Sequence, residues 1–189
     1  TISNLSVSAG NVVTAFLDGA SEDAVTVTRA TAGNLTGLNL YQNYLIARSE
    51  DASPLTNSNL GQYDSDNDAD IFFAANGGAL NVSSGKMLLL NTSTTFTPGG
   101  TLTLDGGFKQ TAGTFNAPAS ITVSSVWTKT GGTLNHNSGT VNFNLSTTIT
   151  GSHALHHVAF NAGNFDHTIK KATTLNIEGN KSTTSTRNT

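Results

Sequence analysis

The amino-acid sequence predicts an all-β fold, and three observations support that prediction. Charged residues make up only 11% of the 189 residues, well below the usual quarter, and Thr, Ser, Asn and Gly replace them. Glycine or a β-branched residue interrupts nearly every candidate helix. Short segments with alternating apolar and polar residues recur along the chain. Such alternation is typical of strands that bury one face.

Seven segments are predicted to be strands. Six of them alternate, namely residues 24–30, 37–49, 78–82, 101–106, 120–126 and 140–145. The seventh, residues 86–90 (KMLLL), is a continuous apolar run. All seven are short and closely spaced.

A repeat of about nineteen residues organises these strands. The segment FKQTAGTFNA (108–117) returns as WTKTGGTLNH (127–136), with apolar residues replaced by apolar residues. Leu102 precedes Ile121 by the same spacing, and Val141 follows about twenty residues later. A unit of this size cannot bury its own apolar face, whereas stacked copies form one continuous core. The sequence therefore predicts a β-solenoid with coils of about 19–20 residues.

An antiparallel β-sandwich is the alternative, because it also has short strands and frequent turns. The matched register at nineteen residues favours the solenoid. In that fold each apolar side chain stacks on its counterpart in the next coil. Trp127, which is in register with Phe108, is accordingly predicted to lie in the core.

The chain divides into three segments. Residues 1–77 are predicted to form an N-terminal β cap or irregular coils with an acidic loop insertion, and residues 78–179 the solenoid repeats. A capping unit is expected because an open solenoid end exposes unpaired backbone. Residues 180–189 are polar and lack periodicity, which predicts a tail or linker.

Composition excludes several classes of partner. The net charge is −3, the isoelectric point is near 5.9, and no segment concentrates Lys or Arg, so we expect no binding to nucleic acid. No apolar run approaches the length of a membrane-spanning helix, so we expect no membrane insertion. The chain has no cysteine, which excludes disulfides and thiolate sites. Without a signal peptide at Thr1, we expect a mature, excised or partial form.

Several passages resemble repetitive bacterial surface proteins. The stretches FLDGASEDAVTVTRA (16–30), LTGLNLYQNYLIARSEDASPLTNSNLGQYDSDNDADIFF (35–73) and TFTPGGTLTLDGGFKQTAGTFNA (95–117) are similar to low-charge passages of very large surface proteins of uncultivated, candidate-phyla bacteria. The cadence GTFNA…SGTVNF resembles the β-solenoid repeats of adhesins and extracellular fibres. This resemblance implies an extracellular or cell-surface location and a structural role, and no catalytic residues.

The acidic stretch YDSDNDAD is a candidate calcium loop. Asp64, Asp66, Asp68 and Asp70 alternate, and closely spaced carboxylates repel one another unless a cation neutralises them. Their spacing resembles the start of an EF-hand loop. However, Ala69 and Ala75 occupy the positions of the turn glycine and the bidentate Glu. A solvated acidic loop without an ion is the alternative.

We expect no enzymatic activity and assign no catalytic residue. No G-x-S-x-G nucleophile motif is present. Glycoside hydrolysis needs paired carboxylates, and after Asp70 the only acidic residues are Asp105, Asp166 and Glu178. The histidines of SHALHHVAFNAGNFDH (152–167) are not spaced along one strand so as to converge on a metal ion.

The predicted function is that of an extracellular structural protein, a subunit of a self-assembling surface fibre, sheath or large adhesin. Its partner is then another copy of itself, because unpaired strand edges at solenoid ends can pair between subunits. Residues 1–17 alternate like a strand. Their candidate assembly residues are Ile2, Leu5, Val7, Val12 and Phe16. The alternative is an ordinary first strand of the same chain.

Two other functions remain open. A carbohydrate-binding module would use exposed aromatic residues, and the candidates for glycan contact are Tyr41, Tyr44 and Tyr63. An ice-binding solenoid would use ladders such as the Thr-Leu-Thr at 101–103. That ladder does not recur at the nineteen-residue period, and Thr is also a good strand former.

Overall fold

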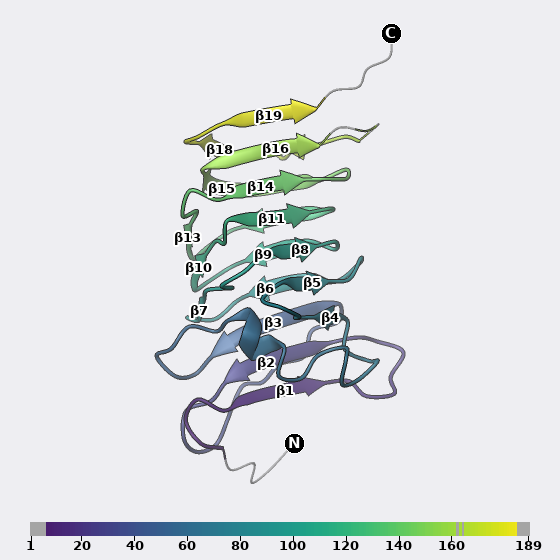
Figure 1. Cartoon of the computed structure of the whole chain (residues 1–189), viewed down its shortest axis with the longest axis vertical. Helices are drawn as coiled ribbons and strands as arrows, with labels where there is room; N and C mark the ends of the chain where they lie inside the picture. Colours follow the sequence, from purple (N-terminus) through teal and green to yellow (C-terminus); the bar gives the residue numbers. More distant parts are fainter. Residues whose placement is uncertain (1–6, 162, 164, 185–189) are drawn as a thin grey trace.

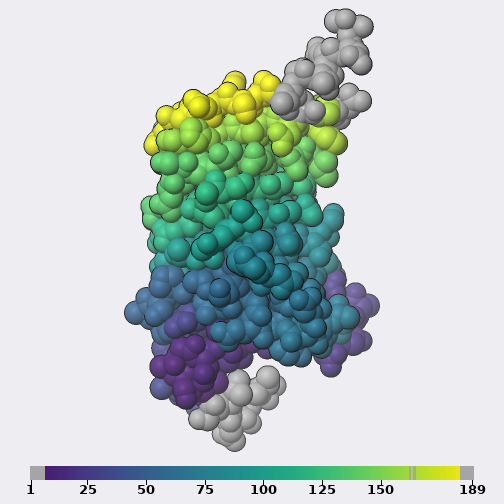
Figure 2. Space-filling view, viewed as in Figure 1, coloured from purple at the N-terminus to yellow at the C-terminus, as the bar shows by residue number. Residues whose placement is uncertain are grey.

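The computed structural model, which describes residues 7–161, 163 and 165–184, is a β-solenoid of about eight turns. Its coils stack along one axis from the N-terminal coils to β19 (Figures 1 and 2). Neighbouring coils pair through parallel strands, apart from β1 and β4. The predicted solenoid is therefore confirmed, and a sandwich of antiparallel sheets is excluded.

Three sheets form the walls of the solenoid. The long sheet contains β1 (Val12–Phe16), β2 (Val25–Arg29), β3 (Tyr44–Ser49), β6 (Met87–Leu90), β9 (Phe108–Gln110), β12 (Val126–Lys129), β15 (Thr148–Leu155), β17 (Thr168–Ile169) and β18 (Thr174–Ile177). The second sheet contains β4 (Phe73–Ala74), β5 (Leu80–Val82), β8 (Leu102–Leu104), β11 (Ser120–Val123), β14 (Thr140–Phe143), β16 (His157–Asn161) and β19 (Lys181–Thr184). The short sheet contains β7 (Thr95–Phe96), β10 (Thr114–Asn116) and β13 (Thr133–Asn135).

Strand register confirms the sequence repeat. Leu102 pairs with Ile121, and Ile121 pairs with Val141. Trp127 pairs with Phe108 and is fully buried, as the repeat predicts. The period holds because each coil places its apolar residues at the same distance from its corner, so that parallel pairing aligns them.

One ladder of apolar side chains runs the whole length of the long sheet. It begins at Phe16 of β1 and ends at Ile169 of β17. Its inner members are all fully buried, namely Val25, Leu45, Leu88, Phe108, Trp127 and Ile149. At the two ends, Phe16 is half-buried and Ile169 is 51% exposed. The core is therefore continuous, and its two terminal residues are the ones that meet solvent.

A long segment joins β3 to β6. It carries α1 (Asn57–Leu60), the acidic loop, β4 and β5. Thr56 caps α1, because its side chain accepts a hydrogen bond from the amide of Asn59. The buried side chain of Asn57 donates to the carbonyl of Gly78 at 2.7 Å, which ties the helix to the coil that follows it.

The N-terminal end differs from the rest of the solenoid in strand direction. β1 runs antiparallel to β2, and β4 runs antiparallel to β5. Parallel coiling starts at β2 and β3, which lie within the first predicted segment. Only the strands outside this parallel stack, β1 and β4, have the reversed direction typical of a cap.

Two expectations about segment limits were wrong. Residues 37–43 of the segment predicted to be a strand over 37–49 are not in a strand: residues 42 and 43 form a turn, and Gly37 and Asn43 have φ angles of 64° and 65°, outside the strand region. Residues 181–184 of the predicted tail form β19, which pairs with β16. A polar sequence carries no apolar alternation, so only the pairing partner identifies this strand. Residues 185–189 lie outside the described residues.

The described residues contain no helix that has both the length and the apolar character required to cross a bilayer.

Candidate functional site

The acidic loop is held together by its first carboxylate. Asp64 is buried, and its two oxygens accept hydrogen bonds from the backbone amides of Asp66 and Ala75, at 3.0 and 2.7 Å. The Asn67 side chain in turn accepts a bond from the Asp64 amide. Asp64 therefore organises the loop backbone and is already engaged on both oxygens.

A different trio of carboxylates converges beside the loop. The oxygens of Asp18, Asp68 and Asp70 lie within 4.8 Å of one another. Asp70 accepts the Gly19 amide at 2.6 Å, and Asp68 accepts the Asp70 amide at 2.9 Å. The structure thus brings two of the four predicted calcium ligands together with Asp18, which lies in the turn between β1 and β2. Calcium takes six to eight oxygen ligands, so three carboxylates alone would form an incomplete shell.

Sequence spacing did not identify Asp18. It lies in the turn after β1, fifty residues before Asp68. The only local signal is the dipeptide Asp18-Gly19, which is typical of a turn and carries no information about distant partners. The convergence arises from the coiling of the chain, which a linear motif does not record.

The three tyrosines occupy separate environments. Tyr41 is 44% exposed and precedes β3. The ring of Tyr44 lies under the Lys109 ammonium group, 5.7 Å from the ring centroid. Tyr63 is 39% exposed, and its ring centroid lies 6.0 Å from that of Phe16. Two of the three predicted glycan-contact residues are therefore engaged with other side chains of the chain.

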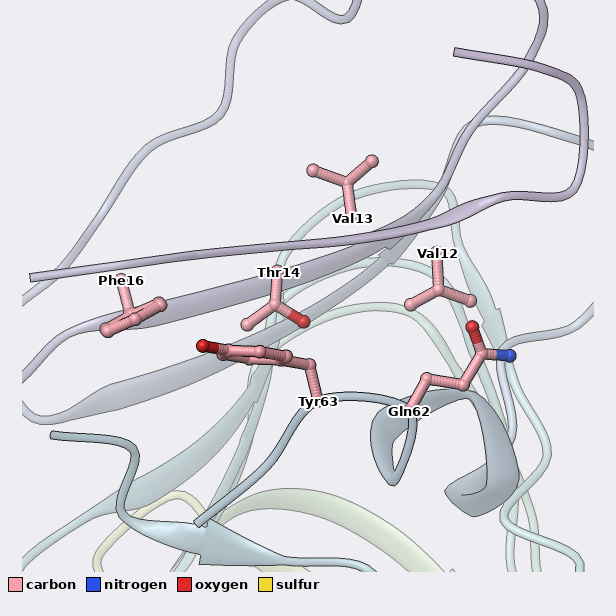
Figure 3. Close-up of a pocket in the computed structure, with 6 residues that line it drawn as sticks. All are labelled: Val12, Val13, Thr14, Phe16, Gln62 and Tyr63. Atoms are coloured by element: carbon pink, nitrogen blue, oxygen red, sulfur yellow. The ribbon is translucent and has the colours of Figure 1, made fainter. Parts of the chain in front are cut away.

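A groove of about 410 Å³ opens at the N-terminal end. It lies between one face of β1 and the segment that follows α1 (Figure 3). Val12 and Thr14 project into it from β1, toward Gln62 and Tyr63, and Phe16 lies at its other end. The buried Thr14 hydroxyl has no hydrogen-bond partner among the described residues. Half-buried residues of β1 and the exposed residues Gln62 and Tyr63 line this groove.

The candidate assembly residues fall partly on β1. Val12 and Phe16 belong to β1 and face the groove. Val7 forms an antiparallel bridge with Gly33. Ile2 and Leu5 lie outside the described residues. Within the described part of the chain, β1 pairs only with β2 and leaves one edge unpaired.

The opposite end of the solenoid also presents apolar side chains and strand edges. β17 and β18 lie end to end along β15, and β19 lies on β16. Ile169 is 51% exposed, and Phe165, just before β17, is 42% exposed. Among the residues that the structure describes, the outer edges of these strands have no partner.

Charge is distributed unevenly along the axis. Residues 7–77 carry nine acidic and two basic side chains, a formal charge of −7, whereas residues 78–184 carry three acidic and six basic side chains, a formal charge of +3. The two arginines of the first segment form ion pairs, Arg29 with Asp51 at 2.8 Å and Arg48 with Glu50. The hydrogen bond from Arg29 lowers the pKa of Asp51 to about 2.

The histidines divide into a buried residue and a surface cluster. His153 is buried beside Trp127. His136 pairs with Glu178 at 2.9 Å and stacks on His156, with ring centroids 5.3 Å apart. The ring of His157 lies perpendicular to that of His156 at 4.1 Å. Within the described residues, no three histidine or carboxylate groups of this cluster converge as the three aspartates do.

No protein-family model, curated protein or solved structure matches this chain.

Proposed function

We propose that this protein is a structural building block whose copies assemble end to end into a fibre, a sheath or the stalk of a large adhesin. The observation that carries the proposal is the pair of unpaired strand edges at the two ends of one continuous core. An exposed edge is a template for pairing with another chain, and end-to-end pairing would place the apolar residues at both ends out of contact with water.

Composition and fold support an extracellular or cell-surface location for this assembly. The chain contains no cysteine and only 11% charged residues. Most outward positions of the second sheet are Thr, Ser or Asn, which present polar groups to water without charge. A rod of stacked coils becomes long and stiff by repeating one short unit, which suits a fibre or stalk.

No catalytic role is proposed. Among the described residues, the grouped carboxylates are Asp18, Asp68 and Asp70, beside the acidic loop. The described residues that line the groove at the N-terminal end are mainly apolar, and none of them is acidic or basic. The Thr14 and Tyr63 hydroxyls are present, but the described lining holds no His, Lys, Asp or Glu that could activate them as nucleophiles.

Calcium binding beside the acidic loop stays a prediction. Asp18, Asp68 and Asp70 would be its protein ligands, and water would complete the shell. An ion there would join the turn after β1 to the acidic loop and would reduce the negative charge of the N-terminal end. Calcium would then change assembly through charge and through the order of this loop.

The two rival functions have weaker support. Glycan binding rests mainly on Tyr41, because Tyr44 and Tyr63 contact Lys109 and Phe16. Ice binding needs a regular outward ladder of threonines. The outward ladder of the second sheet is mixed, and its members are Asn81, Thr103, Thr122, Asn142, Ala159 and Ser182.

Negative-stain electron microscopy of the purified chain tests the proposal. Grids are prepared over a range of protein concentrations, with calcium and with a calcium chelator. We expect rods that lengthen with concentration, and shorter rods after chelation if the acidic loop holds an ion. Dispersed particles under every condition would overturn assembly, and glycan arrays with wild type and Tyr41→Ala would then test the first rival.

A further inference from the structure

We infer that copies contact one another head to tail. In this contact β17 of one copy pairs antiparallel to β1 of the next, so that Ile169 lies opposite Phe16. The inference rests on the self-assembly proposed above and adds its direction, its register and its residues. The occupant of the groove at the N-terminal end is then a second copy of this chain. Four observations support it, and each concerns a different property of the two ends.

The first observation is the apolar ladder of the long sheet. Six fully buried side chains separate its two terminal members, Phe16 and Ile169. Neighbouring parallel coils stabilise one another because each apolar side chain stacks on its counterpart in the next coil. Placing Ile169 of one copy on Phe16 of another continues the same ladder across the junction.

The second observation is the direction in which the free backbone groups point. The amide of Thr168 donates to the carbonyl of Thr147, just before β15, at 2.8 Å, and the amide of Lys170 donates to the carbonyl of Ile149 in β15 at 3.0 Å. Backbone groups alternate in direction along a strand, so the amide and carbonyl of Ile169 face the open edge.

The same reasoning applies to β1. The amide of Leu17 donates to the carbonyl of Ala24, and the carbonyl of Asn11 accepts from the amide of Ala30. The odd-numbered residues of β1 therefore bond to β2. The amide and carbonyl of Phe16 face the other way, toward the open edge. Phe16 and Ile169 are thus matched to exchange two hydrogen bonds as one antiparallel pair.

The third observation is strand direction. β2, β3, β6, β9, β12, β15 and β17 are mutually parallel, and only β1 is reversed in the long sheet. In a coaxial stack with both copies pointing the same way, β17 and the next β1 run antiparallel. That is the direction which the matched backbone groups require.

The fourth observation is the combination of a groove and charge. The groove beside Phe16 has room for an apolar side chain, and Phe165 and Ile169 are exposed at the other end. Residues 7–77 carry a formal charge of −7, and residues 78–184 carry +3, with Lys170 and Lys171 directly after β17. Opposite charges attract in a head-to-tail contact, whereas contacts between two N-terminal ends bring like charges together.

A head-to-tail contact of this kind does not close on itself. Each copy uses two different surfaces, so every junction leaves one free surface of each type at the ends of the assembly. The expected product is an open filament with no fixed number of subunits. A contact between identical ends would instead stop at a dimer.

Cysteine cross-linking tests the register, because the natural chain has no cysteine. With Phe16 opposite Ile169, Ala15 lies opposite Lys170 in a non-hydrogen-bonded pair, where Cα atoms are about 4.5 Å apart, within the range for a disulfide. Ala15→Cys and Lys170→Cys chains are mixed and oxidised. We expect about tenfold more heterodimer than either homodimer, because like ends repel. Lys129→Cys, in the middle of the solenoid, replaces Lys170→Cys as the control and should give little heterodimer.

A pair of substitutions to glutamate tests the contact without cysteine. Ile169→Glu places a charge at the junction, whereas Leu145→Glu places the same charge at a side chain that is 46% exposed on the loop between β14 and β15. Circular dichroism confirms that both variants fold. We expect Ile169→Glu to sediment as a monomer at concentrations where Leu145→Glu and wild type assemble.

The outcomes separate this inference from the proposed function. Filaments in wild type without the Ala15 to Lys170 cross-link, or with equal yields of all three dimers, would overturn the head-to-tail register and leave self-assembly standing. Equal assembly of Ile169→Glu and Leu145→Glu would do the same. A wild-type chain that stays monomeric under all conditions would overturn both.

Discussion

The indole Nε1 of Trp127 donates a hydrogen bond of 2.9 Å to Nδ1 of His153, and both side chains are buried. The other ring nitrogen of His153 lies 2.9 Å from the Thr150 carbonyl oxygen and donates to it. This arrangement requires the neutral imidazole with its proton on Nε2, because Nδ1 must accept. His153 is therefore a buried titratable group in a fixed protonation state.

Acid is expected to destabilise the solenoid through His153. Burial lowers the pKa of His153, the Thr150 carbonyl opposes this effect, and the charge of Lys129 lowers the pKa further. Because the pKa in the folded protein lies below the unfolded value of about 6.5, the stabilising contribution is present above that value and is lost as pH falls below it. Urea unfolding of wild type and His153→Gln at about pH 7.5 and about pH 5 measures this loss. Equal pH dependence in the two proteins would contradict it.

The aromatic stack around Trp127 is expected to dominate the stability of the middle coils. Trp127 lies 4.7 Å from Phe108 and 6.2 Å from Phe143, measured between ring centroids, and is fully buried. Trp127→Ala should lower the free energy of unfolding by about 3–5 kcal/mol. Leu145→Ala, at an exposed site, should change it by less than about 0.5 kcal/mol. Similar losses in the two variants would show that the stack does not carry this stability.

Gly151 is expected to be irreplaceable at a corner of β15. Its φ is 94°, and a Cβ there would overlap the carbonyl oxygen of Lys129 in the preceding coil. Gly85 has a similar φ of 75°, but a Cβ there meets open space. Gly85→Ala should therefore cost about 1–2 kcal/mol from backbone conformation alone. Gly151→Ala should cost clearly more in thermal unfolding, since two coils must separate, and equal costs would contradict the close packing of coils.

The acidic loop is expected to depend on Asp64 more than on Asp66. Removing the buried Asp64 carboxylate leaves the amides of Asp66 and Ala75 without their acceptor, at a cost of about 1–3 kcal/mol. Asp66 is exposed, so Asp66→Ala should cost less than about 0.5 kcal/mol. Chemical unfolding compares the two variants, and calorimetric calcium titration of Asp18→Asn and Asp66→Asn shows which carboxylate an ion uses. Stability that is equally insensitive to both alanine variants would contradict the role given to Asp64.

High salt is expected to weaken assembly. Charge reversal at the end of the solenoid should weaken it too, whereas charge reversal in the middle coils should not. Lys170→Glu/Lys171→Glu makes the end beside β17 more acidic, so it should repel the acidic N-terminal end. Lys109→Glu/Lys129→Glu changes the net charge equally in the middle coils. In sedimentation velocity the first variant should assemble less than wild type at low salt, and the difference should shrink at about 1 M salt, where the screening length is about 3 Å. Equal behaviour of the two double variants would argue against charge steering.

The sequence predicted the core better than the ends. The nineteen-residue match between the segments containing Phe108 and Trp127 identified coils, because parallel stacking requires equal spacing. β19 was missed since Lys181–Thr184 has no apolar residue and is a strand only through its partner β16. Asp18 joined the acidic group for a similar reason, because coiling brings together residues that are fifty positions apart.

The ends also explain why function is harder to infer than fold. Phe16 and Ile169 look like ordinary core residues in the sequence, and only the strand order shows that they terminate the same ladder. The direction of their free backbone groups depends on hydrogen bonds made by their neighbours, Leu17 and Thr168. Neither property has a local sequence signal.

Electron cryo-microscopy of the assembled chain tests coaxial stacking most directly. If copies stack end to end, the strands lie across the filament and repeat along its axis with a spacing of about 4.7–4.9 Å, without a break at the junction between β17 and β1. Coaxial stacking predicts that spacing along the filament axis. Filaments whose strand layers repeat across the axis, or a chain that stays monomeric at every concentration and salt, would contradict it.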